Sequence, residues 1–183
     1  FRSVRETIAC VKKEYPAVPV VLGGIYATLC TEHAQKYSGA DIVMPGNDLT
    51  ALLNYITTRT HHTHEPHFSF TEPDTLPYPA YHLYPNLRSI SMITSLGCPL
   101  ACTYCASRLL QPRFVARTPQ AVYDEILQYH NLFHIHDIAF YDDALLLDPE
   151  KRFIPLAQKL ITASLPINFH TPNGLRIRMI TQE

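Results

Sequence analysis

Hydrophobic positions in the first third of the chain alternate between helical spacing and short continuous runs. Val4, Ile8 and Val11 recur at helical spacing, which predicts an amphipathic helix from Phe1 to Glu14. Pro19 to Leu22 is a short apolar run with β-branched residues, typical of a buried parallel strand. The alternation continues with a predicted helix over 27–37, a strand over 41–44 and a helix carrying Leu49, Leu52, Leu53 and Ile56. It indicates an α/β layer with parallel strands.

A second series of elements occupies the last half of the chain. Thr118 followed by Pro119 predicts a helix start, because a capping hydroxyl precedes a proline at the first helical position. Asp148 followed by Pro149 is another such start, and Pro155 predicts a kink or a later beginning of that helix. Apolar runs predict strands over 89–94, 137–141 and 167–170. This half therefore repeats the alternation of strand and helix.

Residues 59–88 separate the two series. They carry five prolines and a cluster of four histidines without a sustained period, which predicts a linker between a domain over 1–58 and another over 89–183. The clustered histidines are His61, His62, His64 and His67. They either bind a transition metal or are simply polar residues of an exposed segment.

Composition and charge exclude several classes of protein. Of the 183 residues, 46% are hydrophobic and 17% are charged, so the chain can bury an ordinary core. The formal net charge of −1 offers no electrostatic basis for binding nucleic acid or an anionic membrane. No apolar run approaches the roughly 18 residues of a membrane span, and no signal-peptide pattern is visible. Five cysteines, an odd number, indicate a reducing cytoplasm, and we expect Cys10 and Cys30 to be buried in helices.

The other three cysteines, Cys98, Cys102 and Cys105, fall within eight residues. Thiolates this close in one loop point to a metal ion or a cluster. A closed zinc site normally uses paired short spacings, and no second pair exists here, while the ferredoxin run C-x2-C-x2-C differs from this x3, x2 spacing. Three thiolates would hold three irons and leave a fourth open to a substrate. The alternatives are a zinc site completed by a distant histidine, or buried thiols that bind nothing.

The motif C-x3-C-x-aromatic-C, with Tyr104 in the aromatic position and Thr-Ser-x-Gly-Cys-Pro over 94–99, resembles the signature of the radical S-adenosylmethionine (SAM) superfamily. The resemblance implies a [4Fe–4S] cluster held by the three cysteines, whose open iron chelates SAM. It implies that an electron from an external donor such as flavodoxin or ferredoxin cleaves SAM to a 5′-deoxyadenosyl radical. It also implies that 89–183 is the first half of a partial, TIM-like (β/α) barrel.

Glycines follow both strands predicted in the first domain. Gly23 and Gly24 follow the first strand, and Gly46 lies in the turn after the second. Glycine at the carboxyl end of a parallel strand lets the backbone approach a ligand closely, although Gly-Gly is also an ordinary tight turn. Joined to the cysteine motif, this segment resembles the C-terminal part of the Rossmann-like cobalamin-binding domain that precedes many radical SAM domains. The resemblance implies that these glycines flank the nucleotide tail of cobalamin.

Two features depart from that resemblance. The family's turn after the second strand is usually Gly-Glu-Gly-Glu, whereas Gly46 is followed here by Asn47, Asp48 and Leu49. The Asp-x-His-x-x-Gly motif of some cobalamin domains is absent, and it would lie before Phe1. The first strands of such a domain are missing as well, so we expect the chain to be part of a longer protein.

Polar residues follow the later strands of 89–183. Asp142 and Asp143 come after the strand over 137–141, and at most one of them faces the barrel interior because successive residues point to opposite sides. They either bind a ligand or cap the next helix, and the resemblance to strand-Phe-x-Asp-Asp implies contact with SAM or substrate. Asn173 and Arg176 follow the third strand, where the family's polar residues reach towards SAM, although a Pro-Asn-Gly turn needs no ligand.

The sequence therefore predicts a cobalamin-associated radical SAM enzyme that acts on a small-molecule substrate in the cytoplasm, with methyl transfer to an unactivated carbon as the expected reaction. One alternative is a radical SAM methylthiotransferase, although Cys10 and Cys30 lack the cluster spacing that such enzymes carry in their N-terminal domain. Another is a non-catalytic zinc- or cluster-binding module. We expect the chain alone to be inactive, since half a barrel leaves an incomplete site, and no residue is identified as catalytic.

Overall fold

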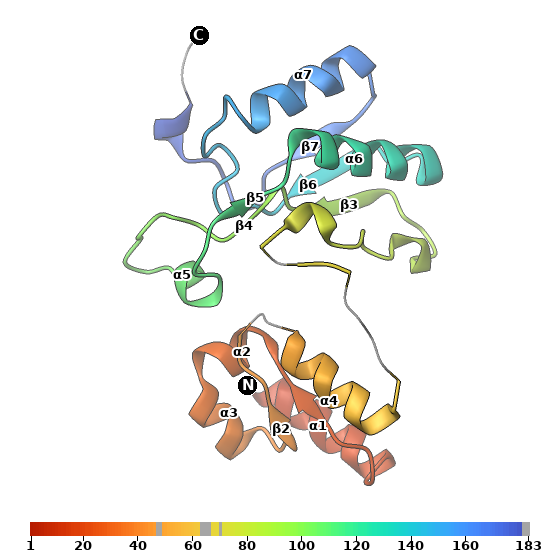
Figure 1. Ribbon diagram of the computed structural model, residues 1–183, viewed down its shortest axis with the longest axis vertical. Coiled ribbons are helices and arrows are strands. Elements are labelled where there is room, and N and C mark those ends of the chain that lie inside the picture. The colour runs from red at the N-terminus through yellow and green to blue at the C-terminus, as the bar shows by residue number, and fades with distance from the viewer. Residues whose placement is uncertain (47–48, 63–66, 70, 181–183) are drawn as a thin grey trace. The chain divides into compact units, whose positions relative to one another are not determined.

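The computed structural model describes residues 1–46, 49–62, 67–69 and 71–180. They form two compact units, Phe1–Glu65 and Pro66–Glu183, each with its own parallel strands (Figure 1). Both units are α/β, as the alternation of helix and strand predicts. None of the helices formed by these residues is long and apolar enough to cross a membrane.

The first unit combines short helices with a two-stranded parallel sheet. Its elements are α1 (Arg2–Glu14), β1 (Val21–Leu22), α2 (Gly24–Leu29), α3 (Thr31–Tyr37), β2 (Ile42–Val43) and α4 (Thr50–Thr60). In the sheet, Val21 pairs with Ile42 and Leu22 with Val43. Ile8 of α1, Ala27 of α2 and Ala34 of α3 are buried. The first helix and both strands are confirmed where the hydrophobic spacing predicts them.

The helix predicted over 27–37 is wrong in one respect, because the structure has two helices there. α2 begins early, at Gly24, and α3 follows after a break at Cys30, whose φ of −131° and ψ of 47° are not helical. The hydroxyl of Thr31 donates to the carbonyl of Ala27 over 2.8 Å, and it thereby takes the acceptor that the N–H of residue 31 would use in a continuous helix.

The expectation that Cys10 and Cys30 are buried is also wrong, since both are exposed. Cys10 lies two positions after Ile8, which turns it to the other side of α1. Cys30 lies at the break between α2 and α3. Small side chains elsewhere, chiefly Ala27 and Ala34, occupy the interior of this unit.

The second unit is built on an open sheet of parallel strands in the order β3-β6-β7. The strands are β3 (Ser89–Met92), β6 (Asp137–Phe140) and β7 (Asn168–His170). Each is joined to the next by a crossover containing a helix, α6 (Pro119–Phe133) after β3 and α7 (Phe153–Ala163) after β6 (Figure 1). The three predicted strands and their parallel pairing are therefore confirmed.

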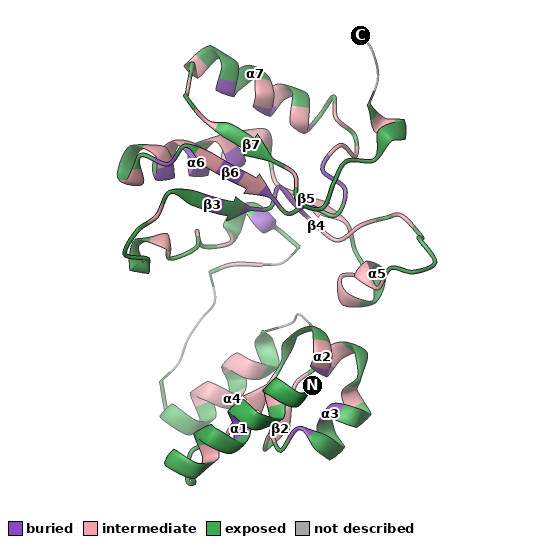
Figure 2. Ribbon diagram, turned by 180° about the vertical axis from the view of Figure 1, so that it is seen from behind, coloured by how far each residue is buried: buried purple, intermediate pink, exposed green. Residues whose placement is uncertain are grey.

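The core of this unit lies between the sheet and its two helices. Alternate residues of the strands turn to the helices, because side chains in a strand point to opposite faces. These residues are Ile90, Met92, Ile138 and Phe140, and they pack with Val122, Ile126 and Tyr129 of α6 and with Leu156 and Leu160 of α7. Seen from behind, the strands lie in front of α6 (Figure 2), so the other face of the sheet carries no helix from the described residues.

Part of the segment predicted as a linker packs against this core. Two short 3-10 turns, Pro73–Thr75 and Tyr81–Leu83, lie in it. The hydroxyl of Tyr81 donates to the carbonyl of Ser91 over 2.6 Å and accepts from the N–H of the same residue over 3.0 Å. Tyr81 thereby occupies hydrogen-bonding groups on the edge strand β3, where exposed backbone groups would otherwise invite pairing with another strand.

Of the two predicted helix starts, the one at Thr118-Pro119 is confirmed by its capping geometry, and the one at Asp148-Pro149 is wrong. The side chain of Thr118 accepts a hydrogen bond from the N–H of Ala121 over 3.2 Å, and Pro119 is the first residue of α6. α7 begins at Phe153, later than Asp148-Pro149, and Pro155 lies in its first turn. The later start agrees with the position of Pro155, because a proline is tolerated in the first turn of a helix but not in its interior.

Candidate functional site

The three clustered cysteines lie on one loop that an antiparallel stem closes. The stem pairs β4 (Ser95–Leu96) with β5 (Val115–Ala116), and the short helix α5 (Ser107–Leu110) lies inside the loop. Gly97 opens the loop with a φ of +77°, and a Cβ on it would lie 2.4 Å from the carbonyl oxygen of Arg113. This close approach needs glycine. The stem was not predicted, because two residues per strand are too few to show a period.

All three thiols are free. Cys98 is half-buried, while Cys102 and Cys105 are exposed. The sulfur of Cys105 lies 3.2 Å from the hydroxyl oxygen of Ser107 and accepts from the N–H of Ser107 over 3.4 Å. Hydrogen bonding of the Ser107 hydroxyl and N–H to the sulfur favours the thiolate and lowers the pKa of Cys105, whereas burial and the negative charge of Asp143 oppose that shift. Tyr104, between the last two cysteines, is 91% exposed and free to contact a ligand.

The thiols supply suitable ligands for a metal centre, but the structure does not gather them around one point. Among the described residues, no three His, Cys, Asp or Glu side chains are grouped so that they could hold a metal ion. Free thiols on one loop, with a backbone N–H directed at one sulfur, are the donor set that an iron–sulfur cluster uses. The residue types therefore fit a cluster, and the loop must rearrange to bind it.

The carboxylates after β6 have different surroundings. Asp142 is buried, with a side chain that is 0% exposed, and its oxygens accept from Thr94 and from Ser95, the first residue of β4. Asp143 is exposed, and its charge acts on Cys105. Of the two residues, Asp143 is thus the one available to a ligand at the cysteine loop. The burial of Asp142 and the exposure of Asp143 agree with the rule that successive side chains at a strand end point to opposite sides.

Asn173 and Arg176 lie in the segment that follows the carboxyl end of β7. The Asn173 side-chain amide donates to the carbonyl of Tyr141 over 2.9 Å, which ties the loop after β7 to the end of β6. Arg176 is exposed at the start of the turn Ile177–Met179. The structure therefore places Asn173 beside the carboxyl end of β6, whereas Arg176 lies six residues beyond the last residue of β7.

The predicted glycines of the first unit come together at the carboxyl ends of β1 and β2. Gly24 has a φ of +80° and Gly46 a φ of +90°, so both occupy the left-handed region that favours glycine. The hydroxyl of Thr28 donates to the carbonyl of Gly24 and accepts from the N–H of Gly46, each over 2.9 Å. Gly23 also approaches the second turn, since a Cβ on it would lie 3.5 Å from the carbonyl oxygen of Met44. Asn47 and Asp48 lie outside the described residues.

The described part of the histidine cluster, His61, His62 and His67, forms no metal-binding group. His61, His62 and His67 are exposed, and His64 lies outside the described residues. His61 ends α4 in the left-handed conformation, with a φ of 57°. Within the described ranges the cluster contributes no group of metal ligands.

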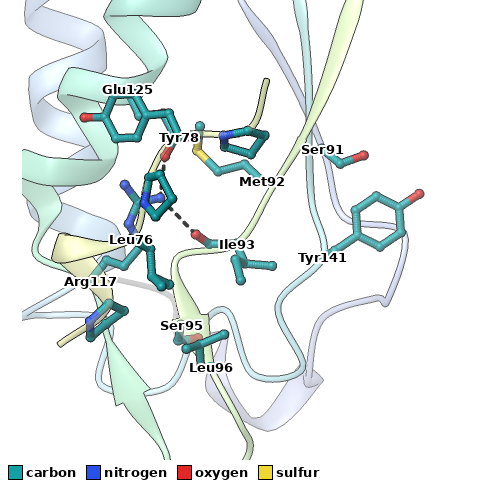
Figure 3. A pocket seen from close by; sticks show the side chains of 13 residues that line it. Leu76, Tyr78, Ser91, Met92, Ile93, Ser95, Leu96, Arg117, Glu125 and Tyr141 are labelled. Atoms are coloured by element: carbon teal, nitrogen blue, oxygen red, sulfur yellow. Dashed lines mark hydrogen bonds and ion pairs between the residues drawn. The ribbon is translucent and has the colours of Figure 1, made fainter. Parts of the chain in front are cut away.

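A cavity of about 230 Å³ lies between residues 73–79 and the end of β3 (Figure 3). Its lining is largely apolar, and its charged groups are Arg117 and Glu125, both buried. The Arg117 guanidinium donates to the Glu125 carboxylate and to the carbonyl of Ile93 (Figure 3). Burial raises the pKa of Glu125, and Arg117 opposes that shift. The sequence alone did not indicate this pair.

The helix-free face of the sheet carries a hydrogen-bonded carboxylate. His170 Nε2 lies 2.8 Å from an oxygen of Asp137, and the Asn168 amide lies 3.4 Å from the same oxygen. The His170 bond is the main reason why the pKa of Asp137 lies below its ordinary value. A depressed carboxyl pKa contributes stability that is present above the ordinary pKa and is lost as the pH falls through the folded value.

Removing the imidazole of His170 is expected to raise the pKa of Asp137 towards the ordinary value of about 3.9, because the carboxylate loses its strongest hydrogen bond. The pKa is measured from the carboxyl ¹³C shift across an acid titration. His136→Ala is the control, since His136 affects the pKa of Asp137 through its charge and less strongly than the hydrogen bond from His170 does. An Asp137 pKa that is the same in His170→Ala and the unmodified chain would contradict the assignment.

No protein-family model matches the chain. It is similar to an uncharacterized methyltransferase of Pyrococcus horikoshii, with 29% identity over 104 residues. The matched stretch makes up 52% of this chain and 22% of that protein, so the chain spans about a fifth of the relative's length.

Proposed function

We propose that this chain is part of a radical SAM methyltransferase in which Cys98, Cys102 and Cys105 hold a [4Fe–4S] cluster. One observation carries the proposal: three free thiols at the spacing C-x3-C-x2-C lie on one loop that follows the first of three parallel strands. α/β enzymes place their ligands at the carboxyl ends of parallel strands. The similarity to an uncharacterized methyltransferase supports methyl transfer as the class of reaction.

The residues around the loop have distinct roles in this proposal. The three cysteines bind the cluster, and Asp143, Asn173 and Arg176 offer polar groups at the strand ends to SAM or to a small-molecule substrate. Tyr104 presents an exposed aromatic ring beside the cysteines. When bound, the cluster and SAM supply a 5′-deoxyadenosyl radical that removes a hydrogen atom from the substrate, with the electron coming from an external flavodoxin or ferredoxin.

The first unit is proposed as the end of a cobalamin-binding domain. Its two strand ends are linked through Thr28, and Gly23, Gly24 and Gly46 leave the backbone of both turns accessible. A Cβ on Gly24 or Gly46 would meet no atom of the described residues within 4 Å, which leaves space for a bulky ligand tail beside these turns. In this proposal 1–58 belongs to that domain, 59–88 connects it, and 89–183 is the first half of a partial (β/α) barrel.

Anaerobic reconstitution with iron and sulfide tests the cluster. We expect about four irons and four sulfides per chain, and a reduced-state paramagnetic resonance spectrum that changes when SAM is added. Cys102→Ala should lose most of the iron because it removes one of three ligands. Cys10→Ala is the matched control, since Cys10 is an exposed thiol outside the loop, and it should retain the full iron content. Zinc in place of iron, or a cluster whose spectrum ignores SAM, would overturn the proposal and favour a zinc- or cluster-binding module.

A further inference from the structure

A buried carboxylate and a buried guanidinium meet at the start of the cysteine loop. Asp142 accepts from the N–H of Thr94 over 2.9 Å, from the hydroxyl of Thr94 over 2.7 Å and from the hydroxyl of Ser95 over 2.6 Å. Arg152 Nη2 donates to the same Thr94 hydroxyl over 2.9 Å and lies 3.6 Å from an oxygen of Asp142. The Thr94 hydroxyl thus joins the two charged groups.

Arg152 also reaches the other end of the loop. Its guanidinium lies over the ring of Phe114, 5.1 Å from the centroid, and Phe114 directly precedes β5. Its Nη1 donates to the carbonyl of Leu147 over 2.9 Å, which anchors the guanidinium to the connection before α7. A planar fork with several donors can make these contacts at once, whereas an ammonium group cannot.

These contacts connect residues that are far apart in the chain. Asp142 and Thr94 are separated by 48 positions, and Arg152 and Thr94 by 58. Charged groups with an exposed fraction of 9% or less are costly to bury unless they are paired and hydrogen-bonded. Their partners are at the stem of the cysteine loop, and Ser95 is itself the first residue of β4. The buried, charged contacts of Asp142 and Arg152 therefore lie at the two ends of the cysteine loop.

We propose that Asp142 and Arg152 are positioning residues that hold the stem of the cysteine loop, so that its three thiols can be brought onto one cluster. The inference rests on the proposed function, because the cluster is the group that the loop would serve. Asp142 fixes Thr94 and Ser95, and Cys98 follows Ser95 after only two residues. Arg152 fixes the returning side through Phe114.

The test uses the metal-free chain first, so that it does not depend on the cluster. Asp142→Asn keeps the shape of the side chain but removes its charge and one of its acceptors. We expect hydrogen exchange at Leu96 and Val115 of the stem, and alkylation of Cys98, to accelerate about tenfold or more, because bonds to a buried charge are lost. Exchange at Ile138 in β6 should change far less. Asp124→Asn is the matched control, since Asp124 is an exposed carboxylate on α6 that accepts from Gln120.

Thr94→Val provides a second variant in case Asp142→Asn does not fold. It removes the hydroxyl that both charged groups share and keeps the β-branched shape. After reconstitution, both variants should bind less than half the iron of the unmodified chain. If the unmodified chain binds no iron, the proposed function fails while the exchange and alkylation still test the positioning. The inference would be overturned if the variants exchange at the stem, and are alkylated at Cys98, at rates within twofold of those of the unmodified chain. It would also be overturned if exchange in β6 accelerates as much as exchange at the stem.

Discussion

Replacing Glu125 by alanine is expected to lower the free energy of unfolding of the second unit by about 3–5 kcal/mol, because it leaves the Arg117 guanidinium buried without its main counter-ion. The two side chains are only 4% and 9% exposed, so water cannot replace the lost carboxylate. Asp74 is the remaining carboxylate near Arg117, and it lies 3.8 Å from Nε. Native-state hydrogen exchange at Ile126 and Ile138, both in the core, measures the loss.

The matched control for this prediction is an exposed ion pair. Glu6 accepts from Arg2 one turn earlier in α1 over 2.8 Å, and the two side chains are 62% and 91% exposed. Glu6→Ala should cost no more than about 0.5 kcal/mol, read from the amides of α1, because solvent screens such pairs. A loss below about 1 kcal/mol in Glu125→Ala would show that Arg117 finds another partner, and that the buried pair is not what holds α6 to the end of β3.

Gly97→Ala is expected to open the stem of the cysteine loop. A φ of +77° disfavours alanine by about 1–2 kcal/mol, and the added Cβ would lie 2.4 Å from the carbonyl oxygen of Arg113. Since that oxygen belongs to the backbone of the opposite side of the loop, the two sides must separate. We expect faster hydrogen exchange at Leu96 and Val115, with a total cost of about 2–4 kcal/mol for the stem.

Gly174→Ala separates the two causes of that cost. Gly174 has nearly the same backbone conformation, with a φ of +74°, but no atom of the described residues lies within 4 Å of a Cβ placed on it. This control should therefore show only the conformational penalty of about 1–2 kcal/mol, confined to the loop after β7. If Gly97→Ala costs no more than Gly174→Ala, the approach to Arg113 does not constrain the loop, and the loop tolerates a side chain at its first residue.

The helices and strands that could be predicted are those determined by residues close to one another in the sequence. The apolar spacing that placed α1 acts over one or two turns, and the capping of α6 by Thr118 involves residues three positions apart. The parallel pairing of β3, β6 and β7 follows from the crossover helix between successive strands, which the alternation of patterns already shows. The three cysteines share one loop because their spacing leaves no other arrangement.

The tertiary structure decided what depends on contacts across the chain. The sequence allowed that only one of Asp142 and Asp143 would face a ligand, but it could not say which, because the choice follows from where Thr94 and Arg152 meet that strand end. The pairing of Arg117 with Glu125 and the stem of β4 with β5 have no periodic signal either. A local pattern records which residues prefer helix or strand, whereas a buried charge is placed by partners that only the folded backbone brings within hydrogen-bonding distance.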